Sequence, residues 1–121
     1  MREILFRGKH VSSGKWIISP SIRQEADGSV YLLVKRTWYC VDPETVGQYT
    51  GLTDKNGKKI FEGDILEWDI EEWKAKGTNH GYRDVVKWDY ELFDTRETDW
   101  KEYCKVIGNV HDDPELLEVA E

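Results

Sequence analysis

The chain has 121 residues, 39% apolar and 34% charged, with a formal net charge of −7. These values predict one soluble globular domain over residues 1–121, with one hydrophobic core. They exclude a membrane-spanning helix, because the most apolar run, Val30–Val34, falls far short of the roughly 18 apolar residues that a span requires.

The N-terminal segment, residues 1–9, carries a charge every few residues and has no apolar stretch of the kind found in secretory signals. The predicted compartment is therefore the cytoplasm. Cys40 and Cys104 are the only cysteines, which is too few for a disulfide framework. Both are predicted to be buried free thiols, since unpaired cysteine behaves as a small apolar residue.

Apolar residues recur at a period of two in short segments bounded by Gly, Asn-Gly, Asp-Pro or Ser-Pro, which is typical of β-strands. The predicted strands are residues 2–7, 15–18, 29–35, 45–50, 64–71, 83–90 and 104–110. Short strands separated by turn signals are characteristic of small barrels and sandwiches. The sequence therefore predicts a mainly β fold.

A chain reversal is predicted at residues 54–58. Asn56-Gly57 tolerates positive φ at both central positions of a type I′ turn, and Asp54 favours a local turn through its own carboxylate. This segment is interpreted as the tip of a hairpin.

Apolar and acidic residues alternate along the predicted strand 64–71. The side chains expected to face the core are Leu66, Trp68 and Ile70. The acidic row on the opposite face is Glu67, Asp69 and Glu71, spaced about 7 Å apart. This row has three interpretations: a divalent-metal patch, a surface that mimics phosphates, or the solvated face of a half-buried strand.

The predicted strand 83–90 repeats the alternation. Its apolar set is Val86, Trp88 and Tyr90, and Lys87 lies on the outward face. If this strand pairs antiparallel with strand 64–71, Lys87 is expected to lie opposite one of the three carboxylates and to reduce their repulsion.

The C-terminal segment has the signals of a helix start. Asp113 is the expected N-cap, Pro114 stands at the first helical position and Glu115 adds a carboxylate to the first turn. One or two turns of helix are predicted there. The segment 71–81 fits either a helical turn or a loop.

The motifs of common catalytic and cofactor sites are incomplete. Gly51 and Gly57-Lys58-Lys59 have the wrong spacing for a phosphate-binding loop and lack its hydroxyl residue, and Asp54 to Gly57 lacks the later acidic ligands of a calcium loop. No histidine or cysteine stands at a zinc spacing, and capping already accounts for Asp113 in the string 111–113. The sequence predicts no enzyme and no cofactor.

Charge is divided unevenly along the chain. Residues 1–60 carry 10 Lys/Arg and 6 Asp/Glu, a net of +4, whereas residues 61–121 carry 7 and 18, a net of −11. If the fold keeps these charges apart, the arrangement would permit head-to-tail self-association, in which the basic face of one copy meets the acidic face of another.

Basic residues gather in two places: Lys35-Arg36 next to Trp38-Tyr39, and Lys55, Lys58 and Lys59 at the predicted hairpin. The candidate interaction surface consists of Lys35, Arg36, Trp38, Tyr39, Lys58 and Lys59, together with the acidic Glu67, Asp69 and Glu71. A groove lined by the basic and aromatic members would suit nucleic acid. The acidic isoelectric point, near 5.0, opposes long-range attraction to a polyanion.

Three blocks of this sequence resemble the YopX family of small phage and prophage proteins. The first is Arg2–Lys9 followed by Gly14–Trp16, the second and most specific is Val41–Leu66, and the third is Val106–His111 ending in Asp113–Leu117. The resemblance implies an SH3-like, mainly β barrel with additional hairpins, and a bacterial cytoplasm as its setting. It implies no catalytic residues. The middle block, rich in Gly and turn residues, is interpreted as mainly fold-determining.

The function expected from the sequence is that of a phage-encoded accessory protein without enzymatic activity. Its expected partner is another protein or a second copy of itself. The alternative is contact with nucleic acid, either directly through Lys35, Arg36, Trp38 and Lys58, or as an acidic decoy that uses residues 62–72 to occupy a host DNA-binding protein.

Overall fold

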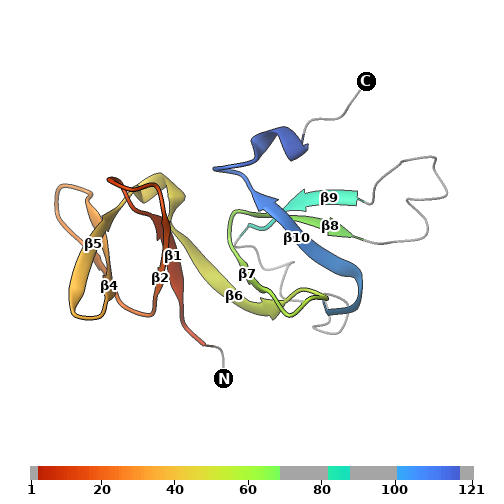
Figure 1. The fold of residues 1–121 in the computed structure, drawn as a ribbon, viewed down its shortest axis with the longest axis horizontal. Coiled ribbons are helices and arrows are strands. Elements are labelled where there is room, and N and C mark those ends of the chain that lie inside the picture. The colour runs from red at the N-terminus through yellow and green to blue at the C-terminus, as the bar shows by residue number, and fades with distance from the viewer. Residues whose placement is uncertain (1–2, 69–81, 88–100, 118–121) are drawn as a thin grey trace. The chain divides into compact units, whose positions relative to one another are not determined.

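The structure, a computed structural model, describes residues 3–68, 82–87 and 101–117 (Figure 1). The chain divides into two compact units, Met1–Gly51 and Leu52–Glu121. The described part is mainly β, as predicted. No helix in it is long and apolar enough to cross a bilayer.

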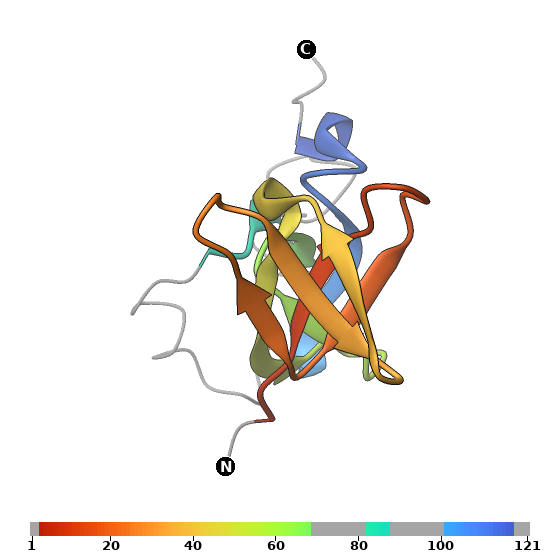
Figure 2. The ribbon, with the colours of Figure 1, turned by 90° about the vertical axis from the view of Figure 1, so that its left-hand side faces the viewer.

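The first unit contains five strands and the start of a sixth. They are β1 (Phe6–Lys9), β2 (Trp16–Ser19), β3 (Ile22–Gln24), β4 (Val30–Val34), β5 (Thr37–Val41) and β6 (Gly47–Thr53), with the 3-10 helix η1 (Pro43–Thr45) between β5 and β6. β2, β1 and β6 are neighbours in one sheet, and β3, β4 and β5 form another. Figure 2 shows the second sheet toward the viewer, with β1 and β2 behind it.

The second unit contains the end of β6 and four further strands. They are β7 (Lys59–Phe61), β8 (Asp64–Trp68), β9 (Tyr82–Val85) and β10 (Cys104–Asn109), followed by the 3-10 helix η2 (Pro114–Leu117). β6 has β7 as its other neighbour, and β10, β8 and β9 form a three-stranded antiparallel sheet.

Buried apolar side chains in the described residues form two clusters, one in each unit, where chain length had suggested one core. The first is Val30, Leu32 and Val41, packed with Phe6, Ile17 and Val46. The second is Ile60, Leu66, Val86 and Cys104, packed with Leu52, Trp68 and Val106. Among the described residues, the expected single core is thus divided in two, because the buried side chains of each unit pack with others of the same unit.

The predicted inward faces are confirmed at Leu66, Trp68 and Val86, although Ile65, on the face of Glu67, is buried as well. Leu66 is buried and Trp68 packs against the same cluster, while Glu67 is on the other face. Val86 is buried in this cluster too. Ile70, Trp88 and Tyr90 lie outside the described residues.

Three strands escaped prediction. They are β3, β5 and β7. β3 and β7 have three residues each, and Trp38–Val41 of β5 are all apolar, so none shows a clear alternation of apolar and polar residues. The first predicted strand, 2–7, is displaced to Phe6–Lys9, because pairing with β2 extends through Gly8 and Lys9.

The chain reverses at 54–58 as predicted, but not through a type I′ turn. Gly57 has φ +79°, whereas Asn56 has no positive φ. The Gly57 N–H donates to the Asp54 carbonyl at 3.0 Å, and the Asp54 N–H donates to the Lys58 carbonyl at 2.9 Å. This is a three-residue loop that closes with a left-handed glycine.

A helix is barely present near the C-terminus, where η2 is a single 3-10 turn. Pro114 and Glu115 occupy the predicted positions. The Asp113 carboxylate does not cap this turn as predicted; its Oδ2 accepts the Asn109 N–H at 3.2 Å. The carboxylate lies beside Gly108 and Asn109. It can do so because Gly108 has no side chain; a Cβ at that position would clash with Asp113.

Candidate functional site

The outer face of the β3–β4–β5 sheet carries the most distinctive group of exposed side chains. The register places Arg23 beside Tyr31 and Leu33 beside Trp38. Because neighbouring side chains in a strand alternate, Arg23, Tyr31 and Trp38 share one face, and Leu32 and Val41 share the buried one.

Arg23 lies across this outer face and stacks on two aromatic rings. Its guanidinium carbon is 4.9 Å from the Tyr31 ring centroid and 4.8 Å from that of Trp38. Cation–π contacts at such exposed positions contribute about 0.5–1 kcal/mol each, and they hold the guanidinium against the sheet. We call Arg23, Tyr31 and Trp38 the arginine–aromatic stack.

Two further cations stand at the tip of the β4–β5 hairpin. Lys35 and Arg36 form its two-residue loop, with Val34 paired to Thr37. Both have positive φ, 48° and 70°, which is the signature of a type I′ turn. Both are exposed, and neither side chain has an ion-pair partner among the described residues.

Replacing Lys35-Arg36 by Asn-Gly is expected to stabilise the protein by about 1–2 kcal/mol, because these residues adopt the left-handed conformation at a lower cost. Urea denaturation measures the change. Lys35→Ala with Arg36→Ala removes the same two charges without relieving the backbone, so it serves as the control. An Asn-Gly variant no more stable than this control would contradict the prediction.

The candidate surface from the sequence is divided between the two units. Lys35, Arg36, Trp38 and Tyr39 belong to the first unit, and Lys58, Lys59 and Glu67 to the second. Tyr39 faces away from Trp38 and makes a T-shaped contact with the His10 ring at a centroid distance of 5.4 Å. Lys58 and Lys59 are exposed at the 54–58 hairpin. Asp69 and Glu71 lie outside the described residues.

The unit boundary also separates the charges. Residues 1–51 carry 7 Lys/Arg and 5 Asp/Glu, whereas residues 52–121 carry 10 and 19. Lys35, Arg36, Trp38 and Tyr39 therefore belong to the unit with a net positive charge, whereas Lys58 and Lys59 belong to the acidic one.

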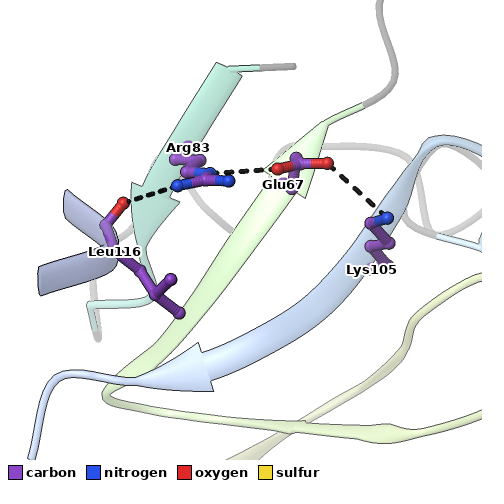
Figure 3. Close-up of polar contacts among 4 residues, drawn as sticks. All are labelled: Glu67, Arg83, Lys105 and Leu116. Atoms are coloured by element: carbon purple, nitrogen blue, oxygen red, sulfur yellow. Dashed lines mark hydrogen bonds and ion pairs between the residues drawn. The ribbon is translucent and has the colours of Figure 1, made fainter. Parts of the chain in front are cut away.

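Glu67 is engaged on both sides by cations of neighbouring strands (Figure 3). Its Oε2 accepts the Arg83 Nε–H at 2.9 Å, and its Oε1 lies 3.6 Å from the Lys105 Nζ. Arg83 also donates from Nη1 to the Leu116 carbonyl at 3.0 Å, which ties η2 to the sheet. Both Glu67 contacts are direct cross-strand pairs, so this carboxylate stabilises the sheet.

Lys87 was the wrong partner for the acidic row. β8 and β9 do pair antiparallel, but the register places Arg83 opposite Glu67, and β9 ends at Val85. The described residues contain no group of three His, Cys, Asp or Glu side chains placed to hold a metal ion.

In the long middle block of the sequence, Val41–Leu66, two buried carboxylates accept hydrogen bonds from backbone N–H groups. The buried Asp54 accepts the Asn56 and Lys58 N–H groups on Oδ1 and the Val106 N–H on Oδ2, each at 2.9 Å. Asp64, also buried, accepts the Phe61 N–H at 2.8 Å. These carboxylates shape turns, because each is engaged by N–H groups of its own loop.

The two cysteines differ in environment. Cys104 is fully buried, and this burial raises the pKa of its thiol to about 12, with the Asp54 carboxylate as a smaller cause. Cys40, on β5, is half-buried and lies opposite Tyr31 of β4, so the prediction of burial was only partly right.

Iodoacetamide is expected to modify Cys40 of the native protein well before Cys104, because only the thiolate reacts and Cys104 stays protonated near neutral pH. Peptide mass spectrometry of a timed reaction measures both rates. In concentrated urea the two rates should converge. Equal rates in the native protein would contradict the expected burial of Cys104.

Comparison with known proteins gives a family and a structural relative. A family model described as YopX protein matches residues 9–118. The crystal structure of protein EF1440 from Enterococcus faecalis is similar with a TM-score of 0.52 and 23% sequence identity, covering 98% of this chain and 100% of that one. This likeness supports the fold alone. No curated protein matches the chain.

Proposed function

The chain belongs to the YopX family, and on this premise we propose that it is a non-enzymatic module that binds another protein, or a second copy of itself, through the outer face of the β3–β4–β5 sheet. An SH3-like arrangement of its strands and a phage or prophage origin in a bacterial cytoplasm are parts of the same proposal. They rest on the resemblance described above.

The observation that carries the proposal is the arginine–aromatic stack on an exposed sheet face. Trp and Arg are enriched in protein interfaces and dominate their binding energies, because both offer large contact areas with directional polar groups. Trp38 is 37% exposed although it is one of the largest side chains in the first unit. Its contact with Arg23 already restricts the conformational freedom of the side chain, so binding loses less entropy on ordering it.

The test compares three proteins: the native chain, a stack variant with Arg23→Ala and Trp38→Ala, and a control with Lys15→Ala and Ile18→Ala. The control removes a cation and an exposed apolar side chain from the β1–β2 hairpin of the same unit. Light scattering over a concentration series measures self-association, and cross-linking in lysate of the bacterial host measures partners.

The expected result is a defined complex for the native chain and the control, and its loss for the stack variant. A strict monomer that recovers no partner at any concentration would overturn the proposal. If the stack variant recovers the same complex as the native chain, the outer face of the β3–β4–β5 sheet is not the binding surface.

Direct contact with nucleic acid is the second candidate, supported by the exposed Lys35 and Arg36 beside Trp38. Fluorescence anisotropy with single- and double-stranded DNA at low and moderate salt tests it. Phosphate binding must weaken steeply as salt rises, so flat anisotropy at low salt removes this candidate.

A further inference from the structure

β3 is an edge strand of its sheet, with β4 as its one neighbour among the described residues. The Ser21 carbonyl accepts the Leu33 N–H at 3.2 Å, and the Glu25 N–H donates to the Ser29 carbonyl at 2.8 Å. In an antiparallel pair, hydrogen-bonded and non-hydrogen-bonded positions alternate. The backbone groups of Ile22 and Gln24 therefore point away from β4.

These outward groups form a short, bounded row. Pro20 precedes the strand, and the Ser21 N–H is already taken by the Ser19 hydroxyl at 3.0 Å. At the other end the chain turns at 25–29 toward β4. Within the described ranges this edge is open and thus offers the N–H and C=O groups of two residues, and all three side chains of β3 are exposed.

Arg23 adds a directional charge to this edge. Its Nε–H contacts Glu25 Oε1 at 2.9 Å, where both side chains are nearly half exposed. Its two Nη groups have no partner among the described residues. The stack on Tyr31 and Trp38 keeps them on the outer face next to the open backbone row.

We propose that β3 binds an extended acidic segment of a partner protein by strand addition, with a partner carboxylate paired to the Nη groups of Arg23. This inference rests on the proposed protein-binding function and names the chemistry of the bound segment. Main-chain hydrogen bonds to Ile22 and Gln24 provide affinity, and Arg23 provides selectivity. Lys35 and Arg36 add positive charge at the tip of the same sheet.

The arrangement favours a peptide over a nucleic acid for two reasons. A row of backbone donors and acceptors that has no partner in the described part of the chain pairs with another polypeptide backbone, which a nucleic acid lacks. The Tyr31 and Trp38 rings, which base stacking would require, already have the Arg23 guanidinium over them.

The strand also predicts the pattern of its ligand. Arg23 points to the outer face, so the added strand needs an acidic side chain at the neighbouring position on that face. Ile22 points to the opposite face and is 38% exposed, so the flanking positions favour aliphatic side chains. A segment that alternates aliphatic and acidic residues meets both requirements.

The experiment uses the full chain and fluorescent nine-residue peptides that alternate Val with Glu, Gln or Lys, plus a twelve-nucleotide oligothymidine. We expect the Val/Glu peptide to bind most tightly and the Val/Lys peptide least. Arg23→Met keeps the apolar stem and should weaken the Val/Glu peptide about tenfold, the size expected for a lost charge-assisted hydrogen bond.

The backbone contribution is tested with Gln24→Pro, which removes an outward N–H and none of the β3–β4 hydrogen bonds. Gln24→Thr retains that N–H and is the matched control. We expect the proline variant to weaken the Val/Glu peptide about tenfold and the threonine variant to leave its affinity within about twofold. Amide exchange provides an independent readout, since peptide binding should protect Ile22 and Gln24.

Absence of Val/Glu binding, equal affinity for the Val/Lys peptide, tighter binding of the oligothymidine, or unchanged exchange at Ile22 and Gln24 would each overturn this inference. The proposed protein-binding function is tested separately, by the stack variant. If the stack variant loses its complex while no peptide binds, the function stands and strand addition fails.

Discussion

Replacing Asp54 by asparagine is expected to lower the free energy of unfolding by about 3 kcal/mol. The Asp54 side chain is buried, and its two oxygens accept three backbone N–H groups. An asparagine retains one oxygen and turns an amide NH₂ toward one of these donors, so at least one buried N–H loses its acceptor.

The position of these donors explains the size of the effect. Two lie in the 54–58 loop, and the third, from Val106, belongs to β10. The Lys55 N–H also donates to the Cys104 carbonyl at 2.9 Å, so the loop is bonded to β10 in two places. Loss of the carboxylate should therefore weaken both the loop and its attachment to the sheet.

Urea denaturation measures the change, and hydrogen exchange locates it at the Lys58 and Val106 amides. Asp27→Asn is the control, because Asp27 also accepts a backbone N–H, from Ser29 at 2.9 Å, but lies on the surface. It should change stability little. Equal effects of the two substitutions would show that burial of Asp54 does not matter.

Replacing Gly8 by alanine is the second large expected effect, a loss of about 1–3 kcal/mol through overpacking. A Cβ at this position would stand 2.7 Å from Val41 Cγ2 and 2.9 Å from Val41 Cβ. Val41 is fully buried among Val30 and Leu32, so it has little room to move. β1 and the end of β5 approach one another closely because this position lacks a side chain.

A double-mutant cycle separates this steric cause from strand propensity. Val41→Ala alone should destabilise the first unit by removing buried methyl groups. The double variant, Gly8→Ala with Val41→Ala, should be more stable than the sum of the single effects predicts, by about 1 kcal/mol. Additive effects would show that the short Gly8–Val41 approach is not the cause.

Local sequence patterns were reliable where the structure depends on neighbours along the chain. The alternation at Leu66, Glu67 and Trp68 predicted which faces are buried, because successive side chains of a strand point to opposite sides. Asp54 and Gly57 predicted the reversal at 54–58, because each favours a bend through its own backbone or side chain. The three motif blocks predicted the YopX family, which the match over residues 9–118 confirms.

Pairings between distant segments could not be predicted in the same way. The sequence offered Lys87 as the cation opposite the acidic row, but the register of β8 and β9 selects Arg83. The register depends on where each strand begins and which face packs into the core, and a shift of one residue exchanges every partner. Lys105, the other neighbour of Glu67, comes from a strand much later in the chain.

The arginine–aromatic stack was missed for the same reason. Trp38 was among the candidate residues, but Arg23 was not, because β3 has no pattern that marks it as a strand. Tyr31 lies on a predicted strand, but without β3 nothing in the sequence placed a cation beside it. The type I′ turn was also misplaced. It occurs at Lys35-Arg36, where the pairing of β4 and β5 leaves two residues to close the hairpin and outweighs their own backbone preference.

By itself, the sequence determined the mainly β class, the inward faces of its clearest strands, the site of one tight turn and the family, since these follow from short-range periodicity, turn preference and motif order. The tertiary structure alone decided that buried residues form two clusters, that Glu67 lies between Arg83 and Lys105, and that Arg23 stacks on Tyr31 and Trp38. These features depend on strand register, which side-chain packing and loop closure fix only when distant segments meet.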